Sequence, residues 1–144
     1  MSRGGWRTLG VILALFAAGH TLGTAAPHVT RGAQEAAVFR AMQTFSFPIM
    51  GFERSYWDFY RGFALTISVL LAVMAVIAWQ LGALTLREPR QALPMAITLL
   101  LGCLGIAVIS WLFFFGGPIV FSVAAVMWST VLVVRLAKAA RVTG

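Results

Sequence analysis

Four long runs of apolar residues constrain this 144-residue chain more than any other feature. They cover residues 9–26, 62–84, 93–115 and 118–134. Each run is close to the roughly 20 residues that an α-helix needs to cross about 30 Å of hydrocarbon. Backbone N–H and C=O groups find no partner in lipid, so such segments must be helical. The sequence therefore predicts an all-α fold, a bundle of four transmembrane helices that forms one membrane domain.

The overall composition supports a membrane protein. The chain is 60% hydrophobic and 10% charged, whereas soluble domains contain about 25% charged residues. Its net charge of +7 could indicate nucleic-acid binding, but the basic residues stand at the ends of apolar runs. That placement favours anchoring to anionic lipid headgroups. We therefore expect membrane lipids as partners and no nucleic acid.

The distribution of basic residues predicts an orientation. They cluster before the first run, between the second and third, and in the tail at residues 135–144. By the positive-inside rule, both termini are then cytoplasmic, and the connection at residues 27–61 lies outside. The residues concerned are Arg3, Arg7, Arg87, Arg90, Arg135, Lys138 and Arg141. The first run also resembles a secretory signal ending in "GTAA", but we favour a retained span.

The outer connection at residues 27–61 is the one large polar element. Ala36, Phe39 and Met42 recur at spacings of three, which predicts a short amphipathic helix at the outer interface. The segment "SFPIMG" contains proline and glycine and is expected to end that helix.

The stretch "ERSYWDFYRGF", residues 53–63, then leads into the second span. As a helix it places Arg54, Asp58 and Arg61 on one face, so that the aspartate bridges both guanidinium groups. One interpretation is an interfacial anchor, since tyrosine, tryptophan and arginine all favour the membrane surface. The other is a binding site shared with the first span.

His20 carries the second interpretation, because it is the one ionisable side chain well inside a predicted span. It lies roughly 16 Å along the first helix, and such residues usually face the bundle interior. The candidate ligand-binding residues are His20, Glu53, Tyr56, Trp57, Asp58, Tyr60 and Arg61. The alternative is a neutral imidazole that holds two helices together. Gly19 and Gly23 are expected to let helix backbones approach closely.

No metal site or cofactor is predicted, since one intramembrane histidine cannot supply two axial haem ligands. Cys103 is expected to be a packing residue. Nucleotide-binding, nucleophile-elbow and zinc-protease motifs are absent from the sequence. No catalytic residue can be assigned, and enzyme activity stays open.

The order of "GHTLG", a polar outer connection and "SYWDFYRGF" resembles small bacterial four-helix membrane proteins of the DoxX-like and domain-of-unknown-function type. The resemblance implies the bacterial cytoplasmic membrane but no activity. The favoured function is a non-enzymatic accessory or structural subunit, or scaffold, that associates with other membrane subunits or with copies of itself. The alternative is a lipid- or quinone-type ligand-binding protein, enzymatic or not, that uses His20 with Asp58, Tyr60 and Arg61. Proton-coupled transport is disfavoured because the predicted spans contain no acid.

Overall fold

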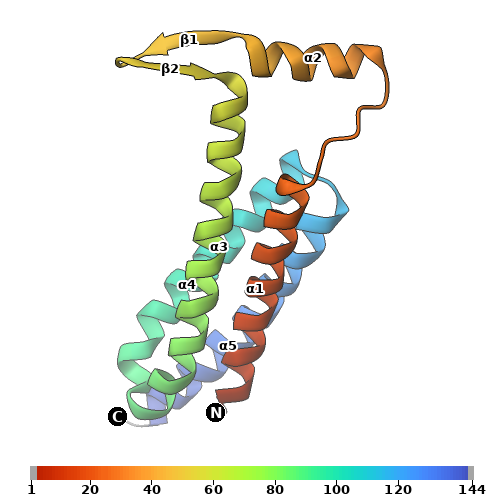
Figure 1. The fold of residues 1–144 in the computed structure, drawn as a ribbon. Coiled ribbons are helices and arrows are strands. Elements are labelled where there is room, and N and C mark those ends of the chain that lie inside the picture. The colour runs from red at the N-terminus through yellow and green to blue at the C-terminus, as the bar shows by residue number, and fades with distance from the viewer. Residues whose placement is uncertain (1–2, 143–144) are drawn as a thin grey trace.

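The computed structural model describes residues 3–142 and confirms the all-α fold. Four of its helices are long and apolar enough to cross a membrane, and they form one bundle (Figure 1). They are α1 (Arg3–Ala25), α3 (Tyr56–Arg87), α4 (Pro89–Phe113) and α5 (Gly116–Val142). A short helix, α2 (Ala33–Thr44), lies between the first two spans, as predicted. The chain is thus a multi-pass membrane protein.

The connection between α1 and α3 contains an element that the sequence pattern did not predict. Strands β1 (Ser46–Ile49) and β2 (Phe52–Ser55) form an antiparallel hairpin. Its two turn residues, Met50 and Gly51, have φ angles of 51° and 87°. Positive φ at both positions is the geometry of a two-residue type I′ turn, whose twist matches that of the strands. The chain therefore reverses at Met50 and Gly51, instead of only breaking the preceding helix.

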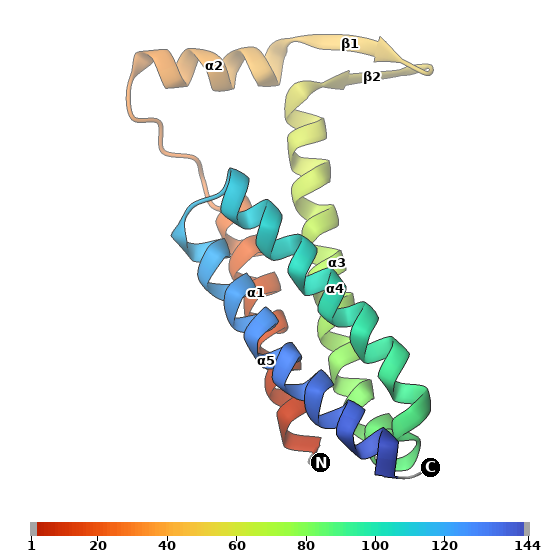
Figure 2. The same cartoon turned by 180° about the vertical axis from the view of Figure 1, so that it is seen from behind.

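The four long helices contain most of the apolar runs, but α1, α3 and α4 begin six, six and four residues before the predicted starts at residues 9, 62 and 93. Helix α4 ends two residues before the predicted limit at residue 115. Helix α5 continues beyond residue 134, so residues 135–142 of the predicted tail are helical. The last two residues of that tail lie outside the described residues. At 32 residues, α3 is about 48 Å long, and its first turns rise above the other three spans (Figure 1, Figure 2).

Helix α2 and the hairpin lie across the raised end of α3 (Figure 1, Figure 2). We call α2, β1 and β2 together the platform. No residue of α2 is buried, so the platform is not part of the bundle core. It stands at the end of the bundle opposite both termini.

The core lies in the half of the bundle nearer the termini. Helix α1 packs mainly against α3, and α4 against α5. A Cβ atom at Gly10 would stand 3.1 Å from the carbonyl oxygen of Ala75, and one at Gly82 would stand 3.2 Å from Trp6 Cβ. These two glycines therefore permit the close approach of α1 and α3. Toward the platform the core narrows to a small cluster formed by Phe16, Ala17 and Leu71.

The first turn of α3 is fixed by a capping box. The Ser55 hydroxyl accepts from the Asp58 backbone N–H at 3.2 Å, and Asp58 Oδ2 accepts from the Ser55 N–H at 2.8 Å. Arg54 lies in β2, and its Nη1 donates to the Glu53 carbonyl at 2.7 Å. The predicted helical face of Arg54, Asp58 and Arg61 therefore does not form, because the strand continues through Ser55. Asp58 serves the helix terminus instead of bridging two arginines.

Replacing Ser55 with alanine is expected to destabilise the start of α3 and the platform attached to it. Loss of an N-cap hydroxyl costs about 1 kcal/mol. Hydrogen exchange of the Asp58 amide in detergent should accelerate accordingly. Ser46 pairs with Ser55 across the hairpin, and Ser46→Ala is the matched control that should leave that amide unchanged.

Candidate functional site: a cavity beside His20

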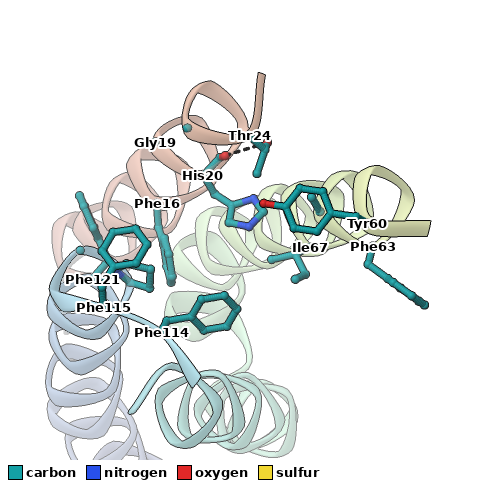
Figure 3. Close-up of a pocket in the computed structure, with 14 residues that line it drawn as sticks. Phe16, Gly19, His20, Thr24, Tyr60, Phe63, Ile67, Phe114, Phe115 and Phe121 are labelled. Atoms are coloured by element: carbon teal, nitrogen blue, oxygen red, sulfur yellow. Dashed lines mark hydrogen bonds between the residues drawn. The ribbon is translucent and has the colours of Figure 1, made fainter. Parts of the chain in front are cut away.

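A cavity of about 490 Å³ lies where the core ends, between α1, α3 and the α4–α5 turn. Its wall is mostly aromatic and apolar, with one imidazole and one phenol (Figure 3). The lining residues include His20, Gly19, Gly23, Tyr60, Phe63 and Phe115. We call this the histidine cavity. Its volume is within the range of small-molecule sites, about 300–1,000 Å³.

Two glycines of α1 help to make this space. A Cβ atom at Gly19 or at Gly23 would meet no heavy atom within 4 Å. The expectation that these glycines mark a close helix contact is therefore wrong. The close contact lies lower in α1, at Gly10, and the upper pair instead faces open space because α3 leaves the bundle there (Figure 1).

His20 is held by a partner on α3. Its Nδ1 lies 3.0 Å from the Ser68 hydroxyl oxygen, which also lies 3.3 Å from the Ala64 carbonyl. If the hydroxyl donates to that carbonyl, it accepts from Nδ1–H, and Nε2 then carries a free lone pair. In either tautomer, Nε2 is the ring atom left for another molecule. The cross-helix hydrogen bond agrees with a structural role, while the cavity beside the ring supplies room for a ligand.

The structure separates the other predicted site residues. Tyr60 lines the histidine cavity with His20, and Figure 3 shows its phenol oxygen on the side of the ring that faces the imidazole. Trp57 and Arg61 lie around a second cavity, under α2. Glu53 is in β2, where it pairs with Pro48.

The two remaining candidates have local structural roles. Asp58 caps α3. The ring of Tyr56 stacks on Phe45, with centroids 6.0 Å apart, and it also contacts Phe47 at 5.0 Å. These contacts hold the hairpin against α3.

The second cavity has a volume of about 590 Å³. It is formed by the end of α1, the connection to α2, one face of α2 and the first turns of α3. Its polar lining residues include Arg40, Gln43, Thr30, His28 and Arg61. We call this the arginine cavity. Gly23, Thr24 and Tyr60 line both cavities, so the two adjoin at these residues.

The chain entering α2 is ordered by Glu35. This carboxylate accepts from the Arg31 backbone N–H and lies 3.2 Å from His28 Nε2. The Arg31 hydrogen bond, followed by that of His28, lowers the pKa of Glu35. The His28 ring in turn lies against the Phe39 ring, with centroids 3.8 Å apart and the two planes tilted by 35°. These contacts position α2 above the arginine cavity.

Sequence reasoning identified His20 and Tyr60 but missed Ser68, the actual partner of the imidazole. The available signal was a serine in the second apolar run, where a polar side chain is unusual.

Comparison with known proteins returned no matching family model, no matching curated protein and no matching solved structure. The resemblance to DoxX-like four-helix proteins therefore stays a prediction. Within residues 3–142, no group of three or more His, Cys, Asp or Glu side chains is placed to hold a metal ion.

Proposed function

We propose that this protein binds a membrane-resident amphiphile of lipid or quinone type in the histidine cavity. The observation that carries the proposal is an aromatic cavity of about 490 Å³ with a single imidazole in its wall, set in a membrane bundle. Sites for small ligands are typically apolar with a few polar groups that fix orientation. His20 and Tyr60 are those groups here.

The margin of the cavity supports entry from the bilayer. Phe63 is 66% exposed and Phe115 is 75% exposed, although both line the cavity. Side chains of this kind at the edge of a membrane bundle contact acyl chains. A ligand dissolved in the outer leaflet could then enter between α3 and the α4–α5 turn without crossing water.

The orientation is part of the same proposal. Both termini and the α3–α4 turn lie at the end of the bundle opposite the platform (Figure 1). The basic residues of the tails and of that turn thus share one end, which the positive-inside rule assigns to the cytoplasm. We place the protein in the bacterial cytoplasmic membrane, with the platform and both cavities on the outer side.

A second candidate is an accessory subunit or scaffold of a membrane complex. It is favoured by the platform, whose hairpin presents apolar side chains without covering them: Met50 is 95% exposed and Phe52 is 61% exposed. Exposed apolar surface of this kind is typical of contacts with a membrane or a protein. A partner subunit, or a second copy of the chain, would then cover the hairpin.

Native mass spectrometry of the full chain, extracted with its lipids, tests both proposals. We expect a bound amphiphile on the wild-type chain. His20→Phe keeps a ring in the wall but removes both nitrogens, and it should weaken binding about tenfold through loss of one hydrogen bond. His20→Asn, which keeps a hydrogen-bonding side chain, should bind more tightly than His20→Phe.

A wild-type chain without any bound amphiphile would contradict the ligand proposal. Equal binding by His20→Phe would contradict the role of the imidazole. A stoichiometric partner protein that leaves when residues 46–55 are replaced by a glycine-serine linker would support the accessory function instead.

A further inference from the structure

We infer that the ligand is an anionic amphiphile, with its phosphate-bearing headgroup in the arginine cavity and its apolar tail in the histidine cavity. This inference rests on the proposed function and names the ligand class. It requires free positive charge in one cavity, an apolar wall in the other, and direct contact between the two.

The arginine cavity contains positive charge that the described part of the chain leaves unpaired. Arg40 comes from α2 and Arg61 from α3, and both line the cavity. Within residues 3–142 neither guanidinium forms a salt bridge, and no acidic side chain lines this cavity. Two arginines that line one cavity without a carboxylate suit a phosphate group, which each can bind through two N–H donors.

The nearby acids are already engaged elsewhere. Glu35, on α2, accepts from Arg31 and contacts His28. Asp58, one turn from Arg61, accepts from the backbone and hydroxyl of Ser55. Asp58 acts on Arg61 only through space, and neither carboxylate lines the cavity or forms an ion pair with its arginines, so the position between them is open to an anion from outside.

The two cavities adjoin and follow one another in the order that the tail and headgroup of an amphiphile require. Tyr60 lines both, and its ring stacks on Trp57 with centroids 5.2 Å apart. The histidine cavity is lined by bundle residues of α1, α3 and α5, and the arginine cavity is lined in part by α2. Helix α2 lies at the end of the molecule, beyond the bundle (Figure 1). A lipid of the outer leaflet has the same order, with its tail toward the bilayer centre and its headgroup at the surface.

The test compares two lipids with identical acyl chains in native mass spectrometry of the full chain. We expect the wild type to bind dioleoyl-phosphatidylglycerol at least tenfold more tightly than dioleoyl-phosphatidylcholine. Both lipids carry a phosphate, but the choline ammonium of the second cancels its net charge and is repelled by the two guanidinium groups. The double variant Arg40→Gln/Arg61→Gln should lose this preference to within about twofold and still bind phosphatidylcholine through the histidine cavity.

The matched control is Arg31→Gln/Arg54→Gln, which changes the net charge equally. Neither of these side chains lines the arginine cavity, and that of Arg54 lies over the Phe52 ring at 5.2 Å. The control should keep the wild-type preference. If it loses the preference as fully as the cavity variant does, the effect comes from bulk charge and the inference is overturned.

Two further outcomes separate the inference from the function on which it rests. Equal wild-type binding of both lipids would overturn the anionic headgroup but leave amphiphile binding intact. Binding of neither lipid would overturn both. Displacement of phosphatidylglycerol by an equal concentration of glycerol phosphate would show that a soluble phosphate suffices, and would overturn the assignment of the tail to the histidine cavity.

Discussion

Replacing Gly10 with phenylalanine is expected to force α1 and α3 apart and to destabilise the whole bundle. Gly10 is buried, and even a Cβ atom there would stand 3.1 Å from the Ala75 carbonyl oxygen and 3.6 Å from the Trp79 ring. The carbonyl belongs to the backbone of α3 and cannot move aside as a side chain can. Because a whole ring has to fit where a methyl group is already tight, we expect a cost of about 3 kcal/mol or more.

The measurement is the loss of helical signal of the full chain in detergent as denaturant or temperature rises. Gly105→Phe is the matched control, because Gly105 is exposed on α4 and its Cβ would meet nothing within 4 Å. We expect the control to be as stable as the wild type. The stability of Gly10→Ala should lie between that of the control and that of Gly10→Phe. Wild-type stability of Gly10→Phe would contradict the close contact of α1 with α3.

The helices were predictable because the membrane imposes one solution on long apolar runs. Within each run, however, the sequence does not distinguish a glycine at a helix contact from one beside a cavity. Gly10 and Gly19 both begin a small-xxx-small spacing on α1, yet one is buried against α3 and the other faces open space. The difference depends on where α3 leaves the bundle, which is a property of the tertiary structure.

The hairpin was missed for a different physical reason. "SFPIMG" contains a proline and a glycine, and both are typical of a loop. Pro48 nevertheless fits an edge strand, where its missing N–H has no consequence. The strands are held by contacts that are not local in sequence, among them the Phe47 ring stacked on Phe59 at 6.0 Å.

The candidate site was predictable only in part. An imidazole inside a span stands out by composition alone, and an antiparallel second span places Tyr60 near it. The hydrogen bond of His20 to Ser68 depends on the vertical register of α1 against α3. The first turns of α3 rise above the bundle (Figure 1), and neither Asp58 in those turns nor Glu53 in β2 lines the histidine cavity.

Replacing Gly19 with phenylalanine is expected to abolish amphiphile binding while leaving the fold intact. A side chain at this position enters the histidine cavity, since its Cβ would meet no heavy atom within 4 Å. The ring would occupy space that the ligand tail needs, so we expect binding to fall at least tenfold. Glycine is also among the poorest helix formers, so the substitution should not weaken α1.

The same substitution at Gly10, Gly19 and Gly105 therefore separates structure from function. Unfolding in detergent should be altered at Gly10 alone, whereas native mass spectrometry of the folded variants should show ligand loss at Gly19 alone. If Gly19→Phe binds the amphiphile as the wild type does, the tail lies elsewhere and the histidine cavity is not the site. If Gly19→Phe is destabilised in detergent as much as Gly10→Phe, the space beside His20 closes in the membrane and α1 contacts α3 along its whole length.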